Sequence, residues 1–213
     1  MINVLFLLLA YLLGSIPFSY LFGEIFRHQD IRQFGSGNIG ATNAFRVFGK
    51  VIGIPVMILD TLKSGTLVFL MLHTGWFDGM DLWNPLWFGL ASVVGHCYPI
   101  WFKFKGGKGV ATSFGLLLAY DWRIAMAIVV IFLIMEIATR YVSVSSVTSS
   151  IAMLLLVIVR YFTFDQDLNL ILVTLGAVII IIIRHQSNFK RLLAGKENRI
   201  KWLDFLDKKP SAQ

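Results

Sequence analysis

Long apolar runs alternate with short polar segments along the whole chain. The runs lie at about 3–23, 51–72, 84–102, 110–120, 122–138, 144–162 and 167–183. About 20 apolar residues are enough for an α-helix to cross the hydrocarbon core of a bilayer. The pattern shows neither the alternation typical of strands nor an internal repeat. It therefore predicts an all-α, polytopic membrane helix bundle with seven transmembrane helices. This bundle forms one domain over residues 1–201, followed by a short polar tail over residues 202–213.

The composition supports a membrane protein, because 57% of the residues are hydrophobic and only 15% are charged. A soluble domain cannot bury that much apolar surface. In such a chain the net charge of +7 indicates contact with anionic lipid headgroups rather than with nucleic acid. The single cysteine, Cys97, excludes an intrachain disulfide and a multi-cysteine metal site. The first run has no basic segment before it and no cleavage site, so we expect a retained first helix.

The basic residues fall in four clusters, and their placement predicts the topology. The clusters are Arg27, Arg32, Arg46 and Lys50; Lys103, Lys105 and Lys108; Arg140; and the segment from Arg184 to Lys209. Loops rich in basic residues usually face the cytoplasm. For all four clusters to do so, the segment 110–138 must hold two helices. The N-terminus is then outside and the C-terminus is cytoplasmic. The helix over 110–120 reaches only about 16 Å, so we expect it to be tilted, broken or tucked against other helices.

The first of three unusual polar segments is rich in glycine. It comprises Gly35, Ser36, Gly37, Asn38, Ile39, Gly40, Ala41, Thr42 and Asn43, with Arg46 following. Glycines let successive backbone N–H groups point into one concavity, which binds anions. The guanidinium of Arg46 matches the geometry of a phosphate. The spacing G-x-G-x-x-G also occurs in dinucleotide-binding folds, but those need a preceding strand, and here an apolar helix precedes the segment. A plain glycine-rich turn between helices is the other alternative.

The second polar segment runs from His96 to Gly109 and contains Gly106, Gly107 and Lys108. The glycines allow close approach of the backbone, and Lys108 lies where its ammonium group can meet a phosphate. The neighbouring Lys103 and Lys105 are better explained by their reaching the lipid headgroups. The segment is not a Walker A loop, because no Ser or Thr follows the lysine. His96 is equally compatible with packing and with function.

The third polar segment follows the last apolar run and extends from Arg184 to Arg199. His185 and Asn188 are three residues apart, so they share a face if the segment is helical. Histidine is the commonest proton acceptor near neutral pH. A basic amphipathic tail on the membrane surface explains Lys190 and its neighbours. It gives no reason, however, for a His–Asn pair directly after the last transmembrane helix.

Three smaller features have a structural alternative. Ser143, beside Arg140, lines the same pocket or bonds its own helix. Asp60 and Lys63 share a face of the second run, and we interpret them as a structural ion pair. His73 and Asp78 fit the H-x₄-D pattern of acyltransferases that use acyl thioesters. The predicted topology puts them outside, so we interpret the match as chance.

In this order, the segments GSGNIGATNAFR, GHCYPIWFKFKGGKGVATSFG and RHQSNFKRLLAGKENR resemble the bacterial PlsY family. The members of that family are acyl-phosphate:glycerol-3-phosphate acyltransferases. The likeness extends from Tyr11 to Glu197. It departs from the family pattern at Phe189, where isoleucine is expected, and at the longer tail. Neither departure removes a reactive group.

The resemblance implies transfer of a fatty acyl group from acyl phosphate to glycerol 3-phosphate, giving lysophosphatidate and inorganic phosphate. It implies a monomeric, multi-pass enzyme of the bacterial cell (inner) membrane with a cytoplasmic active site and no metal or other cofactor. The catalytic candidates are His185, Asn188 and Lys108. The candidates for substrate binding are Ser36, Gly37, Asn38, Thr42, Asn43, Arg46, Gly106, Gly107, Ser143 and Glu197.

The chemistry asks little of the protein, because an acyl phosphate is already activated. The enzyme has to desolvate and orient two anions that repel each other. The proton of the acceptor hydroxyl passes to His185 or, as we favour, to the donor's own phosphate.

Two rival functions use similar features. A small anion channel or phosphate-ester transporter is disfavoured because the motifs lie on one side and no inverted repeat is present. A CDP-alcohol phosphotransferase would need clustered metal-binding aspartates.

Overall fold

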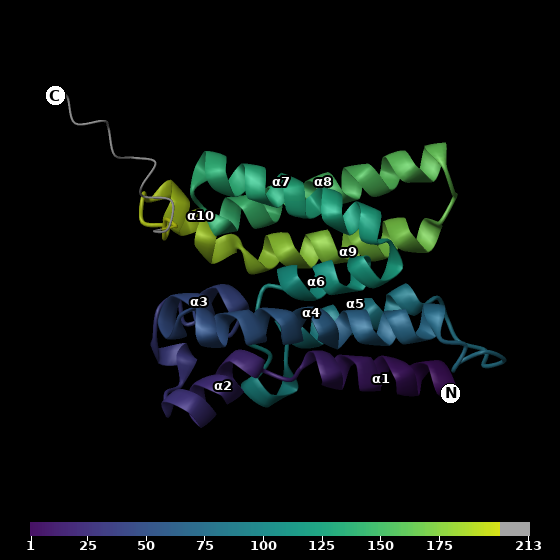
Figure 1. The fold of residues 1–213 in the computed structure, drawn as a ribbon, viewed down its shortest axis with the longest axis horizontal. Helices are drawn as coiled ribbons and strands as arrows, with labels where there is room; N and C mark the ends of the chain where they lie inside the picture. Colours follow the sequence, from purple (N-terminus) through teal and green to yellow (C-terminus); the bar gives the residue numbers. More distant parts are fainter. Residues whose placement is uncertain (201–213) are drawn as a thin grey trace.

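The computed structural model describes residues 1–200, which form helices and connecting loops without a strand. Figure 1 shows these helices running side by side along one axis. The α-helices are α1 (Ile2–Gly14), α2 (Phe18–Arg27), α3 (Ala41–Phe48), α4 (Lys50–His73), α5 (Pro85–Cys97), α6 (Val110–Tyr120), α7 (Trp122–Thr139), α8 (Val142–Thr163), α9 (Leu168–Arg184) and α10 (Gln186–Leu193). Two 3₁₀ turns, η1 (Ile31–Gln33) and η2 (Ile100–Phe102), lie in the loops.

The connections between the helices gather at two ends of the bundle. One end, called the motif end below, carries α3 and α10, together with the loop 98–109 and the junction of α7 with α8 (Figure 1). The opposite end carries the N-terminus, the loop 74–84, the junction of α6 with α7, and residues 164–167. The three polar segments predicted from the sequence therefore lie at one end of the molecule.

Several helices are long and apolar enough to cross a membrane. By length and composition these are α4, α7, α8 and the pair α1–α2, which counts as one span over Ile2–Arg27. The pair α9–α10, bent by 47°, makes a fifth if it is counted as one broken span. Helix α6, with 11 residues, is apolar but short. The prediction of a polytopic membrane helix bundle is confirmed, while the count of seven spans and their orientation stay predictions.

The predicted apolar runs match the observed helices, except that the first run is divided in two. The first run is not one continuous helix. It divides into α1 and α2 around Ser15–Pro17, because Pro17 has no backbone N–H to continue the ladder. The predicted division of 110–138 into two helices is confirmed. Asp121 separates them and accepts a hydrogen bond from the backbone N–H of Arg123 at the start of α7. The predicted tail over 202–213 lies outside the described residues.

Glycines allow two pairs of helices to touch backbone to backbone. A Cβ atom at Gly115 of α6 would lie 1.9 Å from the carbonyl oxygen of Thr61 in α4. A Cβ atom at Gly14 of α1 would lie 2.0 Å from the carbonyl oxygen of Ser92 in α5. Real Cβ atoms do not approach so closely, so any side chain at these positions would force the helices apart. The short helix α6 is thereby tucked firmly against α4, as its length predicted.

Candidate active site

Hydrogen bonds hold the glycines of the second polar segment against the other two segments. The carbonyl oxygen of Gly106 accepts from Asn38 Nδ2 at 3.2 Å and from Arg184 Nη2 at 2.6 Å. The carbonyl oxygen of Gly107 accepts from Arg184 Nε at 3.0 Å. Residues 68 to 78 positions apart in the sequence thus meet at the loop that leads into Lys108. Arg184 was not among the predicted site residues, and its role here is to hold the glycine loop.

The two asparagines of the first segment fold that segment. Asn43 Oδ1 accepts from the backbone N–H of Ser36 at 2.9 Å, and Asn43 Nδ2 donates to the carbonyl of Phe34 at 3.1 Å. Asn38 Oδ1 accepts from the backbone N–H of Gly40 at 2.8 Å. Both side-chain amides are therefore engaged with backbone, a mechanism that stabilises turns. They shape the glycine-rich segment that places Arg46 on α3.

Glu197 joins the end of the described chain to α8 and α10. Its Oε1 accepts from Ser143 Oγ at 2.9 Å and from Asn188 Nδ2 at 2.6 Å, and its Oε2 accepts from Arg191 Nε at 2.9 Å. Burial raises the pKa of this carboxyl, but the three hydrogen bonds outweigh burial and hold its pKa below the usual value. The negative charge of Glu197 is therefore stabilised by three donors, Ser143, Asn188 and Arg191.

These segments surround one cavity of about 660 Å³. Ten of the predicted site residues line it: Ser36, Asn38, Thr42, Asn43, Arg46, Lys108, Ser143, His185, Asn188 and Glu197. The remaining three, Gly37, Gly106 and Gly107, do not line it. The two glycines of the second segment are instead packed behind the wall. A Cβ atom at Gly106 would lie 2.2 Å from the carbonyl oxygen of His96. These glycines are needed for close packing, which is a different reason from the one predicted.

Two cations in the cavity wall lack partners. Neither Arg46 nor Lys108 makes a hydrogen bond or an ion pair with the residues that the structure describes. Burial, followed by the nearby charges of Arg191 and Arg46, lowers the pKa of Lys108 to about 8, although Glu197 opposes the shift. Lys108 is partly buried, whereas Arg46 is exposed, and a cation that loses hydration without gaining a partner is unfavourable unless an anion completes the site. The cavity therefore presents two positive groups to an anionic ligand.

His185 and Asn188 offer hydrogen-bond acceptors in the same wall. His185 Nδ1 lies 2.8 Å from the carbonyl oxygen of Ile181, which can only accept, so Nδ1 carries the proton and Nε2 keeps its lone pair. Asn188 Nδ2 faces the carboxylate of Glu197, and this contact fixes which way its amide points. Asn188 Oδ1 is then buried without a partner among the described residues. Two acceptors for a substrate hydroxyl thus come from residues that are three positions apart and line the same cavity.

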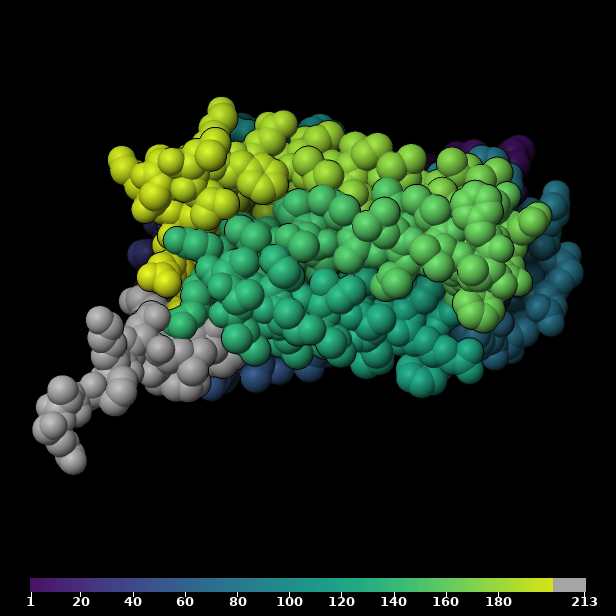
Figure 2. Space-filling view, turned by 90° about the horizontal axis from the view of Figure 1, so that it is seen from above, coloured from purple at the N-terminus to yellow at the C-terminus, as the bar shows by residue number. Residues whose placement is uncertain are grey.

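The cavity continues from the motif end into the apolar part of the bundle. Its deeper wall includes Leu117 of α6, Ile128 of α7 and Met153 of α8. Met153 lies 11 residues beyond the first residue of α8, which corresponds to about 16 Å along the helix. Figure 2 shows α7 and α8 covering the face of the molecule over this region. The cavity therefore joins a polar, cationic end to an apolar channel.

Several cavity residues were not predicted as site residues. Asp60 and His96 face the cavity, and Lys63 connects them. The predicted ion pair of Asp60 with Lys63 is present at 2.8 Å. Sequence spacing could reveal that pair, but not its contact with a helix 33 residues further on. By contrast, His73 bonds the carbonyl of Ala119 near the end of α6, at the opposite end of the bundle from the motifs.

No group of three or more His, Cys, Asp and Glu side chains within residues 1–200 could hold a metal ion. The fold and the cavity together define a class: a helical membrane protein with a cavity that has cationic side chains at one end and apolar side chains deeper in the bundle. Comparisons with known proteins then specify the family. The family model of glycerol-3-phosphate acyltransferases matches residues 4–195. This chain belongs to that family.

Curated relatives and solved structures agree with this assignment. The chain is 43% identical to the glycerol-3-phosphate acyltransferase of Macrococcus caseolyticus, over 93% of this chain and 97% of the relative. It is also 43% identical to that of Enterococcus faecalis, over 92% and 91% of the two chains. Crystal structures of PlsY, an integral membrane glycerol 3-phosphate acyltransferase, in its glycerol 3-phosphate and lysophosphatidic acid forms, superpose with TM-scores of 0.84 and 0.83. Their sequence identity is 36%, over 98% of this chain and 100% of theirs. The chain is thus a membrane glycerol-3-phosphate acyltransferase.

Proposed function

We propose that this acyltransferase takes its acyl group from a long-chain acyl phosphate and releases 1-acyl-glycerol 3-phosphate and inorganic phosphate. One observation carries the proposal: a single cavity joins the unpaired cations Arg46 and Lys108 to an apolar channel. An acyl phosphate has an anionic head and a long apolar chain, and it fits such a cavity end to end. Glycerol 3-phosphate needs only the cationic end. The transfer itself is supported by the names of the relatives above.

In the proposed reaction, the acceptor hydroxyl attacks the carbonyl carbon of the acyl phosphate. The new ester C–O bond forms as the C–O bond to phosphate breaks, and the phosphate leaves with the electron pair. Asn188 Oδ1 accepts the hydrogen bond of the attacking hydroxyl, since it is the buried acceptor left open. An amide does not keep a proton, so the proton passes to an oxygen of the departing phosphate. The lone pair of His185 Nε2 is the alternative acceptor.

Arg46 and Lys108 bring the two phosphates together in this proposal. Each of the substrates is an anion, and they repel each other in water. Preorganised positive groups in a partly dry site reduce this repulsion at little reorganisation cost. Glu197 does not cancel these cations, because Ser143, Asn188 and Arg191 share its charge. Ser36 and Thr42, which are also predicted to bind substrate, line the same cavity and offer hydroxyl groups.

The site would face the cytoplasm of a bacterial cell, with the protein acting as a monomer in the inner membrane. The four basic clusters support this orientation through the positive-inside rule. Reporter fusions after Asp81 and Asp167 should be read outside, and fusions after Lys50 and Lys108 inside. A fusion after Asp81 that reported from the cytoplasm would reverse the orientation and the placement of the site.

A parallel assay of two donors tests the proposed function. Purified enzyme is given glycerol 3-phosphate with either palmitoyl phosphate or palmitoyl-CoA at matched concentration, with a chelator present. Lysophosphatidate and inorganic phosphate should appear in equal amounts from the acyl phosphate, and little product from acyl-CoA. Orthophosphate should inhibit by occupying the cationic end. Comparable turnover with acyl-CoA, or a strict need for a metal, would reject the acyl-phosphate donor.

A further inference from the structure

A buried group of three polar side chains lies directly behind the glycine loop. Lys63 Nζ lies 2.8 Å from Asp60 Oδ1 and 2.7 Å from His96 Nδ1. The three residues come from α4 and α5 and are all at least nine-tenths buried. Asp60 and His96 line the cavity, whereas Lys63 does not. The group is therefore in contact with the substrate cavity, although the proposed reaction gives it no role.

The contacts determine which nitrogen of His96 carries the proton. Lys63 is paired with the carboxylate of Asp60, so its amine is an ammonium group. An ammonium has three donors and no acceptor, and His96 Nδ1 must accept from it. A neutral imidazole that accepts at Nδ1 carries its proton at Nε2. His96 thus has the opposite tautomer to His185, whose Nδ1 donates to Ile181.

His96 Nε2 points toward the glycine loop and has no hydrogen-bond partner among the described residues. An ideal Cβ atom built on Gly107 would lie 2.0 Å from Nε2. The backbone N–H of Gly107 donates to the carbonyl oxygen of His96 at 2.9 Å, which fixes the loop against the ring. Lys108, the next residue, has its own place in the cavity wall. His96 and Lys108 thus line the same cavity, so an anion bound there has a free N–H donor in the cavity wall.

The charges of the group favour this donor role. The carboxylate of Asp60 alone would repel an anion in the cavity, but Lys63 neutralises it at 2.8 Å. Lys63 also donates to the carbonyl oxygen of Ile16 at 3.4 Å, at the break between α1 and α2, and this contact limits its movement. The ammonium holds the imidazole in one orientation. His96 therefore offers a neutral N–H group of fixed orientation.

We propose that His96 Nε2–H is a hydrogen-bond donor to a phosphate oxygen of the substrate held by Lys108, and that Lys63 and Asp60 are positioning residues that set its tautomer. This inference rests on the proposed function only in placing a phosphate at Lys108. It applies equally to a phosphate of the donor, of glycerol 3-phosphate or of the free ion.

Two replacements of His96 distinguish its role as an N–H donor from its hydrogen bond with Lys63. In His96→Asn the side-chain oxygen can still accept from Lys63, but no donor reaches the position of Nε2. In His96→Gln the longer amide brings an N–H group near that position. We expect kcat/KM for glycerol 3-phosphate to fall at least tenfold in H96N and to recover several-fold in H96Q. Lys105→Ala, at an exposed position of the same loop, is the control. Equal losses in H96N and H96Q at similar Tm, or full activity in H96N, would overturn the donor role.

A measurement on the unaltered protein keeps the proposal testable if the variants do not fold. The chain has four histidines, and ¹⁵N labelling reports the protonation of each ring nitrogen by NMR. Exposed His28 and His73 serve as internal controls. We expect one buried histidine protonated at Nε2 and the other at Nδ1. Adding inorganic phosphate should shift the Nε2 signal of the first while the controls stay in place.

These results are independent of the identity of the acyl donor. Failure of acyl phosphate as a substrate would leave the phosphate titration unchanged. A His96 ring protonated at Nδ1, or an Nε2 signal that does not respond to saturating phosphate, would reject the inference. Lys63→Met should release the ring into both tautomers, and unchanged tautomer populations in that variant would reject the positioning role of Lys63.

Discussion

The motif end and the opposite end of the bundle both contain ion pairs, but only the motif end has cavity-lining cations without a hydrogen bond or an ion pair among residues 1–200. At the opposite end, Arg160 forms ion pairs with both Asp121 and Asp165. Tyr120 donates to Asp167, and Asn3 bonds the loop at Asp81 and Trp83. At the motif end, the partly buried Lys108 and the exposed Arg46 have no such partners in residues 1–200.

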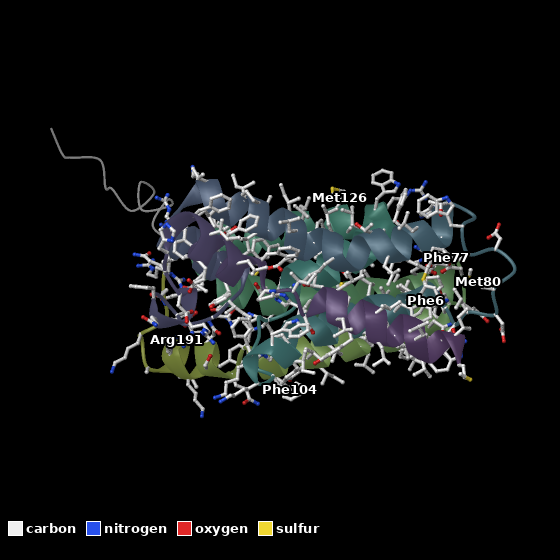
Figure 3. All side chains as sticks on the ribbon, turned by 90° about the horizontal axis from the view of Figure 1, so that it is seen from below. Phe6, Phe77, Met80, Phe104, Met126 and Arg191 are labelled. Carbon is white, nitrogen blue, oxygen red and sulfur yellow. The ribbon has the colours of Figure 1, made fainter. Side chains whose placement is uncertain are left out.

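Figure 3 shows the same contrast in the distribution of side-chain atoms. Nitrogen and oxygen atoms are crowded around the end that carries Arg191, while Phe6, Phe77 and Met80 lie at the other. Phe6 and Phe77 pack edge to face with ring centroids 5.6 Å apart. We interpret the paired charges as contacts that hold helices together, and the unpaired cations as part of the proposed substrate site. Substitutions at the two ends should therefore have different consequences.

The largest effect is expected from Lys108→Met, and a similar one from Arg46→Met. A hydrogen bond to a charged group contributes about 1.5–3 kcal/mol, so each variant should lose about tenfold to a hundredfold in kcat/KM. In Lys108→Met the thermal midpoint should stay the same or rise, because a partly buried, unpaired charge is removed. Lys105→Met, at an exposed position of the same loop, is the matched control. An equal loss in that control would show that the burial of Lys108 is irrelevant.

The next effect separates the two hydroxyl acceptors. Asn188→Ala removes the open Oδ1 and should reduce kcat by about tenfold or more. His185→Gln keeps a polar side chain but cannot take a proton, and should reduce kcat less if the departing phosphate is the base. Single-turnover rates with acyl phosphate measure both. A larger loss in His185→Gln than in Asn188→Ala would assign the proton to the histidine.

The pKa of Lys108, lowered to about 8, predicts a pH dependence. The protonated lysine binds the anion, so kcat/KM should be level below pH 8 and fall by about tenfold per unit well above it. Bound phosphate stabilises the ammonium, and the decline in kcat should therefore occur at higher pH than that in kcat/KM. Lys108→Arg should move the decline out of the accessible range. A profile that falls at the same pH in this variant would assign the titration to another group.

A smaller effect, on stability alone, is expected at the opposite end. Arg160→Met leaves Asp121 and Asp165 without their common partner. Partly exposed ion pairs contribute about 1 kcal/mol or less each, so Tm should fall by a few degrees and kcat/KM should stay within about twofold. A loss of activity at unchanged Tm would contradict the division between the two ends.

The smallest effect is expected for His73→Ala. His73 is exposed and bonds the carbonyl of Ala119, at the opposite end from the cavity. Activity should stay within about twofold of the unaltered enzyme, measured with the same acyl phosphate. An inactive but folded variant would restore the H-x₄-D interpretation that the structure argues against.

Much of this arrangement could be predicted from the sequence because it follows from local patterns. The apolar runs located the helices, and the placement of the basic clusters indicated the division of 110–138. The glycine-rich segments indicated an anion site at Arg46 and Lys108. The break at Ser15–Pro17 was missed, although Pro17 was a visible signal, because the run stays predominantly apolar on both sides of it.

Contacts between distant residues could not be predicted in this way. Glu197 receives its hydrogen bond from Ser143, 54 positions earlier. Lys63 of α4 contacts His96 of α5, a residue 33 positions further along the chain. The glycines at 106 and 107 were read as a phosphate cradle, but packing against His96 and Pro99 explains them. Burial also decides that Lys108 differs from Lys105, and burial depends on how the helices pack rather than on the loop's own sequence.

The backbone contact of α4 with α6 has a practical consequence for changing the fatty acid that the enzyme accepts. A Cβ atom at Gly115 would meet Thr61 at 1.9 Å, so this seam tolerates neither widening nor new side chains. Phe132 of α7 and Met153 of α8 contribute large side chains to another part of the cavity wall. Substitutions meant to change the accepted acyl-chain length should therefore be made on the α7 and α8 side of the cavity rather than at the contact of α4 with α6. Helix α6 follows directly on the glycine loop. Substitutions in α7 and α8 should therefore leave the cationic end of the cavity unchanged.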